Sequence, residues 1–510
     1  MKKAAFLVMI ITIMSKVVGF VREIVLSYVY GASAITDAYL ISQTIPVVIF
    51  SFISAGIATG YIPIYSKIQQ NDGKLNADRF TSNLSNCLLL LVTIIVAFAL
   101  VFTHPIVKLF ASGFSGETLE LAVRFTRMTI FGVYFTAVLN IFSGYLRVHE
   151  HYLAPALIGF PMSFIIISSL FISAKTSVYV IALGNLLAIA SQFIILIPFL
   201  LKTRYKHQIV VDLRDQYLKE MFLISLPVII GTSVNEINVL VDRTLASRIA
   251  VGGISALNYA RRLNGFVQGL VVISLTSVMF PMISKMAAAK NLKGLKRTVI
   301  EAIATMSLLI FPATVGAMTF AEEIVMLLFG RGAFTADAVT MTGAALFYYS
   351  IGMIAFGLRD VLSRAFYALQ DSKTPMMNAI IGIVLNIVLN IILSRYLGIG
   401  GLALATSISA VVVVGLLFIS LRRKIGGFGL SVLSRSFIKI GLASVIMGVI
   451  TRRVFKFLKQ SLGQSISLVI TIGIGVIIYS ILVYLMRIPE VDRTIAAAKR
   501  RLRIMHDVKG

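Results

Sequence analysis

Residues 82–103 read SNLSNCLLLLVTIIVAFALVFT, a run without a single charged side chain. About 20 mostly apolar residues suffice for a helix to cross the hydrocarbon core of a bilayer. The run is continuous from Leu88 onward and lacks the strict alternation of a membrane β-barrel strand. Because only helices and closed barrels satisfy the backbone in lipid, this stretch predicts a transmembrane helix.

Runs of the same kind recur along the whole chain. The composition is 58% hydrophobic and 13% charged with a mean hydropathy of +0.94, far from the half apolar and quarter charged of soluble proteins. Windows of about 19 residues place spans at 4–30, 35–66, 82–103, 123–147, 152–173, 177–201, 218–247, 254–284, 297–320, 338–367, 375–396, 399–421, 437–455 and 466–486. We therefore predict an all-α polytopic membrane protein with about fourteen transmembrane helices.

The basic residues predict the orientation of these spans. By our count 29 Lys and Arg residues fall on one side of the membrane and about nine on the other. The positive-inside rule then puts both termini in the cytoplasm, in a multi-pass protein of the bacterial cytoplasmic (inner) membrane. The net charge of +26 is spread over the loops and forms no long basic tail or aromatic-basic surface, so we expect no nucleic-acid partner.

A weak internal repeat divides the chain. The segment 62–67, IPIYSK, resembles the segment 280–285, FPMISK, which lies six predicted spans later. A shift of six spans preserves orientation, as in transporters built from parallel repeats. We predict two pseudo-symmetric six-helix lobes, residues 1–205 and 206–425, followed by two further helices and a basic cytoplasmic tail in residues 426–510.

Charged residues inside spans cost about 2.5–3.5 kcal/mol each and usually face a bundle interior or a water-filled cavity. In the first span Ser15, Gly19 and Arg22 share a helix face, Glu23 follows, and Asp37 opens the second span. Small residues beside a guanidinium leave room for a ligand. The pattern predicts a functional arginine, although a buried ion pair of Arg22 with Glu23 or Asp37 is the plainer alternative.

The eighth span repeats the pattern. Asn258, Arg262, Gly265 and Gly269 recur at spacings of four, three and four, which favours Arg262 over its neighbour Arg261. The two stripes occupy matching positions in the two predicted lobes, so both arginines are expected to point into one cationic cleft. An arginine fork suits phosphate oxygens.

A second group of polar residues is neutral to acidic. It consists of Asn235, Asn238, Asp242, Asn378, Asn386, Asn390 and Thr406. Carboxylate, amide and hydroxyl oxygens are ligands for a hard cation. The same residues also serve as hydrogen-bonding contacts between membrane helices, and the residues alone favour that reading.

Signatures of bond-making chemistry are missing. The sequence contains no Walker A, GxSxG or HExxH motif, its five histidines lie in loops or at span ends, and Cys87 is its one cysteine. We therefore expect a transporter and not an enzyme. A glycosyltransferase or polymerase would need a large extramembrane loop with catalytic residues.

Four segments carry a resemblance to a known family: 15–23 (SKVVGFVRE), 36–39 (TDAY), 328–334 (LFGRGAF) and 366–375 (FYALQDSKTP). They resemble the MurJ (MviN) lipid II flippase family of the multidrug/oligosaccharidyl-lipid/polysaccharide exporter superfamily. The resemblance covers nearly the whole chain. It implies alternating access between two lobes, a cationic central cavity for the diphosphate and sugars of lipid II, and a hydrophobic groove for the lipid tail on the last two helices.

The resemblance also implies which residues bind the substrate. The family's cavity residues fall on Arg22, Glu23, Asp37 and Arg262, and we add Lys16, Ser15 and Asn258 from the same two stripes. One departure stands out, because an arginine expected on the second helix falls on Phe50.

Some members of the family bind sodium, and this possible site is the only cofactor that we expect. The matching positions are Asp242, Asn386, Asn390 and Thr406, with Leu402 added to the set. Asn390 stands where a carboxylate is expected, so the site is one charge poorer.

The leading function is therefore that of a lipid II flippase in peptidoglycan synthesis. The alternatives are a flippase for an undecaprenyl-diphosphate-linked exopolysaccharide or O-antigen oligosaccharide, and a drug/cation antiporter, which the basic cavity disfavours. The expected partners are a lipid-linked diphosphate sugar and membrane lipids, and we expect a monomer.

Overall fold

The computed structural model describes residues 2–427 and 430–488, and every regular element in them is a helix. The predicted basic tail, residues 489–510, lies outside the described residues. The chain forms two compact units. One runs to Ser255 and includes Phe329–Ala338, and the other comprises Ala256–Leu328 and the chain from Val339 onward.

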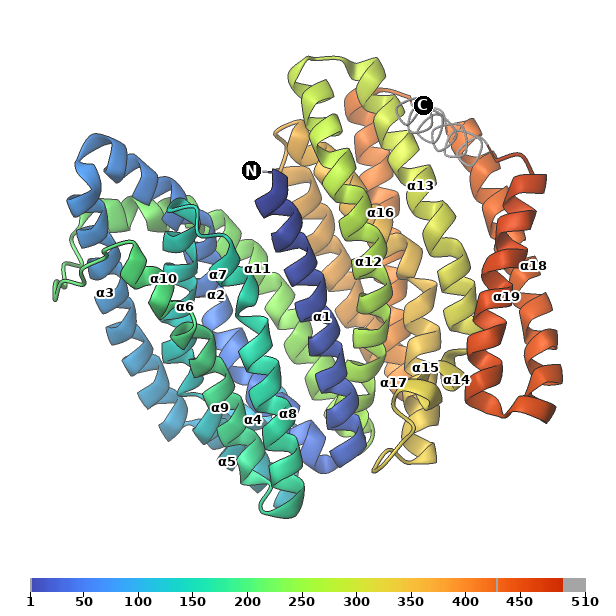
Figure 1. The fold of residues 1–510 in the computed structure, drawn as a ribbon, viewed down its shortest axis with the longest axis horizontal. Coiled ribbons are helices and arrows are strands. Elements are labelled where there is room, and N and C mark those ends of the chain that lie inside the picture. Colours follow the sequence, from blue (N-terminus) through green and yellow to red (C-terminus); the bar gives the residue numbers. More distant parts are fainter. Residues whose placement is uncertain (1, 428–429, 489–510) are drawn as a thin grey trace, which may run out of the picture. The chain divides into compact units, whose positions relative to one another are not determined.

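The first unit contains eleven labelled helices, shown from blue to green in Figure 1. They are α1 (Lys2–Tyr30), α2 (Ala34–Asn71), α3 (Gly73–Val101), α4 (Thr103–Phe110), α5 (Gly116–Thr129), α6 (Gly132–Val148), α7 (Leu153–Leu157), α8 (Gly159–Lys175), α9 (Tyr179–Ile194), α10 (Ile197–Lys202) and α11 (Gln216–Ile249). Helix α2 is central, because it packs against α3, α5, α6 and α11.

The second unit holds most of α12 and the helices that follow. They are α12 (Gly253–Ala288), α13 (Leu292–Thr319), α14 (Ala321–Leu328), α15 (Ala336–Ile351), α16 (Met353–Ala368), α17 (Lys373–Ile425), α18 (Leu430–Leu462) and α19 (Gln464–Leu485). Helices α18 and α19 pack against each other, and α13 packs against α18 (Figure 1).

The all-helical membrane fold is confirmed, whereas the number of spans stays a prediction. Eight of the described helices are long and apolar enough to cross a membrane, and ten spans result if each of two bent helix pairs counts as one. These pairs, α5 with α6 and α15 with α16, bend by 42°. The second bend falls at Gly352, where a Cβ atom would lie 2.7 Å from the Cα of Ser407 on α17.

Helix α17 has 53 residues and covers two of the predicted spans. Its backbone leaves the helical conformation at Gly398, with φ +56° and ψ −133°. Residues with a side chain rarely adopt such a positive φ. The apolar run is therefore interrupted at a glycine, between the spans predicted at 375–396 and 399–421.

Aromatic side chains fill the core of the first unit. Phe50, Tyr61, Tyr65, Phe80 and Tyr145 are buried on α2, α3 and α6. The Tyr65 ring meets Tyr145 edge to face at 5.5 Å, and the Tyr65 hydroxyl donates a hydrogen bond to Asp78 Oδ1 at 2.9 Å. Burial of the ring and pairing of its hydroxyl make tyrosine suitable for this core.

An ion pair joins the start and the end of α17. Lys424 Nζ lies 2.5 Å from Asp371 Oδ2, and Asp371 also accepts hydrogen bonds from the backbone N–H and hydroxyl of Thr374. The hydrogen bond from Lys424 lowers the pKa of Asp371 to about 2. The segment 366–375, noted in the sequence, thus contains Asp371, whose carboxylate accepts a backbone N–H from the first turn of α17.

Candidate functional site

Arg22 and Glu23 form an ion pair on α1. The Nη2 atom of Arg22 lies 3.2 Å from Glu23 Oε1, and the Arg22 side chain keeps 18% of its surface exposed while Glu23 is buried. A carboxylate beside a guanidinium fixes its position and offsets part of its charge. The pairing agrees with the plainer alternative from the sequence, but the exposed part of the guanidinium remains able to meet an anion.

Tyr39, which lies near this pair, and the bonded residues Gln43 and Asn185 were not singled out in the sequence. The Tyr39 hydroxyl is buried within electrostatic reach of Arg22 and Glu23, and among the described residues it has no hydrogen-bond partner of good geometry. One turn further along α2, Gln43 Nε2 donates to Asn185 Oδ1 on α9 at 2.9 Å. The signal was available, because Tyr39 and Gln43 are four residues apart on one face of the helix.

Asp37 has a different environment from the one expected of a substrate ligand. It is 1% exposed. Its Oδ2 accepts from the Gly252 N–H at 2.8 Å, and its Oδ1 accepts from the backbone N–H and the hydroxyl of Ser255 at 2.7 and 2.8 Å. In this structure the carboxylate therefore caps the N-terminal end of α12, where unpaired backbone N–H groups favour an anion.

Of the remaining residues of the first stripe, one packs against a neighbouring helix and the others are exposed or leave open space. A Cβ atom on Gly159 of α8 would lie 2.0 Å from Ser15 Oγ, so Ser15 lies in the close contact between α1 and α8. Lys16 is exposed. A Cβ atom on Gly19 would meet nothing within 4 Å, so the glycine leaves room one turn before Arg22.

The stripe on α12 shows the same open position. Arg262 and Arg261 are both exposed, Asn258 is buried, and a Cβ atom on Gly265 would meet nothing within 4 Å. Exposure alone thus does not separate Arg262 from Arg261. Because Arg22 belongs to the first unit and Arg262 to the second, their convergence in one cavity stays a prediction.

The segment 328–334 packs on α1 next to the candidate arginine. The Ala333 N–H donates to the Tyr28 carbonyl at 2.9 Å, and the Phe329 ring lies 6.2 Å from the Phe20 ring. Gly332 has φ +63°, and a Cβ atom there would lie 2.2 Å from the Tyr28 carbonyl oxygen. Only glycine fits this contact, which gives the glycine of the sequence motif a structural reason.

Phe50 stands where the resemblance implied an arginine, and it faces the hydrophobic core. It is 2% exposed within the aromatic cluster of the first unit. An arginine side chain at this position would bury its charge among apolar groups. The phenylalanine that replaces the expected arginine therefore fits the packed core around α2 in this chain.

The residues of the predicted ion site on α17 are joined by hydrogen bonds. Asn390 Nδ2 donates to Asn386 Oδ1 at 3.0 Å, Asn386 Nδ2 donates to Thr406 Oγ1 at 3.3 Å, and Thr406 Oγ1 donates to the Leu402 carbonyl at 3.0 Å. The bond from Asn386 to Thr406 connects the two halves of α17. Asp242 is buried on α11 in the first unit and α17 belongs to the second, so the approach of Asp242 to the other four residues stays a prediction.

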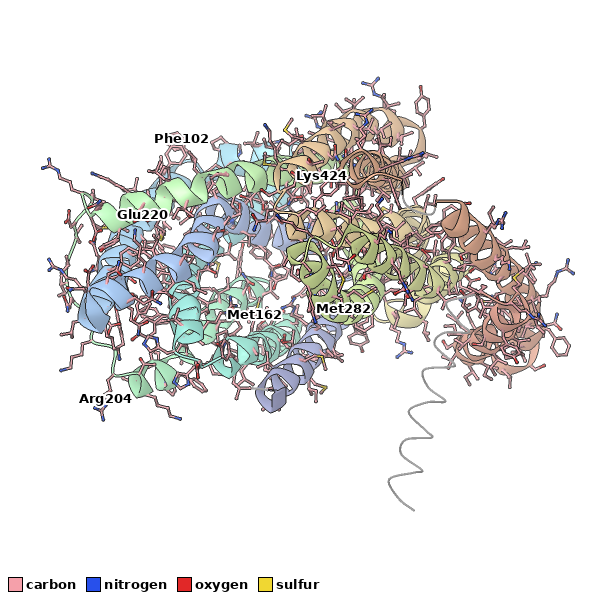
Figure 2. All side chains as sticks on the ribbon, turned by 90° about the horizontal axis from the view of Figure 1, so that it is seen from above. Phe102, Met162, Arg204, Glu220, Met282 and Lys424 are labelled. Atoms are coloured by element: carbon pink, nitrogen blue, oxygen red, sulfur yellow. The ribbon has the colours of Figure 1, made fainter. Side chains whose placement is uncertain are left out.

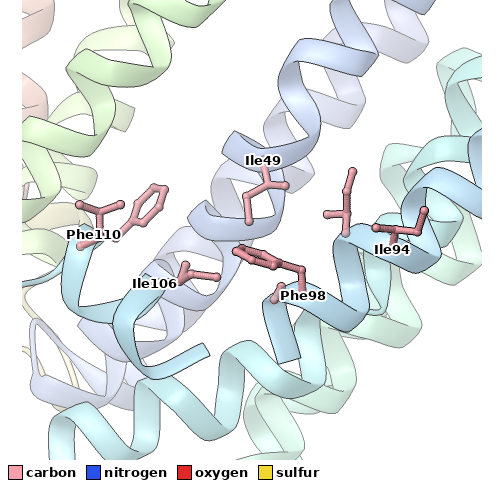
Figure 3. A pocket seen from close by; sticks show the side chains of 8 residues that line it. Ile49, Ile94, Phe98, Ile106 and Phe110 are labelled. Carbon is pink, nitrogen blue, oxygen red and sulfur yellow. The ribbon is translucent and has the colours of Figure 1, made fainter. Parts of the chain in front are cut away.

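Two pockets in the described residues have mainly apolar walls. The first, about 400 Å³, lies between α2, α3 and α4, and Figure 3 shows Ile49, Phe98 and Ile106 pointing toward one another. The second, about 340 Å³, lies between α13 and α18 and is apolar apart from Thr319, Arg452 and Arg453. Arg452 pairs with Glu323 at 2.6 Å. The first pocket suits hydrocarbon and not a diphosphate, and most of the wall of the second is apolar as well.

Comparison with known proteins shows which family this chain is similar to. The family profile described as "Lipid II flippase MurJ" matches residues 26–473. A probable lipid II flippase MurJ of Thermotoga maritima is 28% identical over 485 residues, which cover 94% of this chain and 96% of the relative.

Solved structures give the same result. A lipid II flippase MurJ in an inward closed conformation superposes with a TM-score of 0.82 at 27% identity, covering 94% of this chain and 98% of that one. An inward-facing multidrug resistance MATE transporter of the MOP superfamily has a TM-score of 0.68 at 18% identity, covering 82% of this chain and 96% of that one, which shows a shared fold.

Proposed function

We propose that this chain, which belongs to the lipid II flippase MurJ family, moves lipid II across the bacterial inner membrane. Membership rests on a profile match that covers most of the chain. The family is one of transporters, so the chain is a multi-pass membrane protein that carries a lipid-linked substrate and is not an enzyme. The predicted role in peptidoglycan synthesis follows from the nature of lipid II.

The observation that supports this function most directly is the setting of Arg22. The guanidinium is partly exposed, a buried carboxylate holds it, and Gly19 leaves open space on the same helix face. A planar fork of N–H donors matches the oxygens of a diphosphate in a way that an ammonium does not. We propose that Glu23 positions the fork and that Arg262 supplies a second one from the other unit.

The roles of the other predicted substrate residues differ. Asp37 is engaged with α12 and Ser15 with α8, so both act by fixing the helices that carry the arginines. Lys16 is exposed and can attract an anionic lipid over a longer distance. Asn258 remains a candidate ligand for the sugar or the diphosphate, one helical turn before Arg262.

We also propose the finer topology that the basic residues predict. Fourteen spans, two six-helix lobes and two added helices place both termini in the cytoplasm. The protein acts as a monomer without a nucleic-acid partner. The mainly apolar pocket between α13 and α18 receives part of the lipid tail, in keeping with the predicted groove.

An optional sodium ion belongs to the same proposal. The oxygens of Asn386, Asn390, Thr406 and Leu402 are already close to one another on α17, and Asp242 would add the carboxylate. Amide, hydroxyl and carbonyl oxygens suit sodium, and the single carboxylate predicts weak binding. Bound sodium would neutralise the buried charge of Asp242.

The test is replacement of the resident flippase. Cells depleted of their own lipid II flippase should resume growth and lipid II translocation when they express this chain. The Arg22→Ala variant at equal membrane abundance is the matched control and should not rescue. If the wild-type chain reaches the membrane but restores neither growth nor translocation, the proposed substrate is wrong, and an oligosaccharide-linked lipid becomes the next substrate to assay.

A further inference from the structure

The segment 203–215, between α10 and α11, is held along α3 by side-chain amides. Asn86 Nδ2 donates to the carbonyls of Gln208 and Val210, both at 2.9 Å. Asn83 Oδ1 accepts from the Asp212 N–H at 2.7 Å, and Asn83 Nδ2 donates to the Asp212 carbonyl at 2.9 Å. These bonds fix the backbone at every second residue.

The residues between these attachment points expose apolar side chains. Ile209 is 95% exposed, Val211 51% and Leu213 73%. Gln208 and Val210, which are attached to α3, are half-buried, whereas Ile209, Val211 and Leu213 between and beside these attachments are exposed, so the apolar side chains point away from α3. Single exposed apolar residues are ordinary, but a fixed row of three calls for a covering environment.

The position along α3 at which the segment is attached indicates what covers the apolar row. Asn83 and Asn86 lie at the start of the predicted span 82–103, about 15 Å beyond the first residue of α3, given a rise of 1.5 Å per residue. One turn further, Leu90 and Leu91 are exposed, as expected for side chains that face lipid. The row therefore lies where α3 passes from water into the hydrocarbon.

The charges of the segment favour an anionic surface. Residues 202–219 contain five basic residues, Lys202, Arg204, Lys206, Arg214 and Lys219, and two acidic ones, Asp212 and Asp215. The acidic side chains accept backbone N–H bonds, Asp212 from Arg214 and Asp215 from Tyr217. Arg204 lies at the outer edge of its unit (Figure 2).

We propose that the segment 203–215 is an interfacial anchor that binds anionic phospholipids. Ile209, Val211 and Leu213 enter the boundary between headgroups and acyl chains, and the flanking Lys and Arg residues bind headgroup phosphates. Apolar insertion combined with basic residues is how peripheral segments hold to anionic membranes. The anchor rests on the proposed transmembrane architecture, and its assignment to the cytoplasmic leaflet rests on the proposed orientation.

The absence of tryptophan from the chain allows a direct test. Ile209→Trp introduces the only tryptophan at an exposed position. In nanodiscs of phosphatidylcholine and phosphatidylglycerol, its emission should be blue-shifted, quenched by brominated lipid and protected from aqueous iodide. Gln70→Trp is the matched control, because Gln70 is exposed near the end of α2 and outside the predicted span 35–66. Its emission should be red-shifted and quenched by iodide.

The charge component is tested in the same assay. Quenching of Ile209→Trp by brominated lipid should be greater in nanodiscs with phosphatidylglycerol than in pure phosphatidylcholine, and high salt should remove the difference. Replacing Lys202, Arg204, Lys206 and Arg214 by Gln should remove it as well. Insertion that is equal in both lipids would overturn the anionic specificity.

A tryptophan at residue 209 that stays in water in every nanodisc would overturn the anchor as a whole, and the apolar row would then point to a protein partner. Because the assay measures insertion and not transport, its failure is distinguishable from failure of the proposed flippase activity.

Discussion

Asp37 and Ser255 are hydrogen-bonded to each other and are 218 residues apart in the chain. The same separation relates the segments 62–67 and 280–285, which define the weak internal repeat. Both residues belong to the first compact unit, so the contact ties the start of α12 to α2 within that unit. The equivalence of α2 and α12 as repeats stays a prediction.

The cap on α12 predicts the effect of Asp37→Asn. The amide replaces one acceptor with a donor that faces backbone N–H groups, so at least one charge-assisted hydrogen bond is lost. We expect a loss on the order of 2 kcal/mol in the free energy of unfolding. Thermal unfolding of the purified protein measures it. Ser255→Ala, which keeps the backbone bond, should lower the melting temperature less, and equal stability of Asp37→Asn and wild type would rule out a stabilising cap.

The two candidate arginines predict transport phenotypes. Arg22→Ala and Arg262→Ala should abolish lipid II translocation, and lysine at either position should restore it only in part, because an ammonium lacks the planar fork. Membrane abundance should not fall, since removing a charge from a span eases insertion. Arg261→Ala is the control on the same helix and should transport normally. Normal transport by Arg22→Ala and Arg262→Ala would show that these arginines are structural.

The packing of Phe50 predicts that an arginine cannot be restored there. Phe50→Arg buries a charge in the aromatic core, and Phe50→Ala leaves a cavity that costs about 3–5 kcal/mol in similar cores. Both variants should show lower membrane abundance and melting temperature, whereas Phe50→Leu should be tolerated. A Phe50→Arg protein of wild-type stability and tighter binding of diphosphate lipid would mean that position 50 faces a cavity in another state.

The Asp371–Lys424 pair predicts an acid-dependent loss of stability. The pKa of Asp371 is lowered in the folded protein from 3.8 to about 2. A depressed folded pKa stabilises above the unfolded value, so the contribution is full above about pH 5 and is lost as the pH falls from about 4 toward 2. The melting temperature of the wild type should fall over this range. Asp371→Asn should melt lower at neutral pH, and the gap should close in acid.

The sodium proposal predicts a ligand effect on heat stability. Sodium should raise the melting temperature of the purified protein relative to potassium at equal ionic strength, and the rise should require high concentrations because one carboxylate is present. Asp242→Ala should remove the effect, and Asn390→Asp should strengthen it. A wild-type protein that is indifferent to sodium over a wide range would leave the α17 residues as helix contacts.

The hydrophobic pattern predicted the helical membrane fold because continuous apolar runs have few other structures in a bilayer. It also placed the interruption of α17 close to Gly398, since loops and glycines mark the ends of spans. The pattern did not predict the bend between α15 and α16 at Gly352, where α17 lies in close contact. A bend between two apolar helices leaves no break in the hydrophobic run.

The candidate site was predictable in its charges and less so in its geometry. Arg22 and Glu23 stood out because charges are rare in spans, and the structure pairs them. The capping role of Asp37 depends on Gly252 and Ser255, more than 200 residues away, and Tyr39 and Gln43 look unremarkable in an apolar helix. Phe50 was noticed only through the resemblance, and its burial required the packed core.

The single-residue break at Gly398 has a mechanical consequence. A Cβ atom on Gly401 would lie 2.3 Å from the Leu393 carbonyl oxygen, so the two halves of α17 are in close backbone contact at the turn. The ion pair of Asp371 and Lys424 joins their far ends, and the hydrogen bond from Asn386 to Thr406 joins their middles. The two halves therefore contact each other at the turn, near the middle and at the far ends, and we expect them to move together during transport.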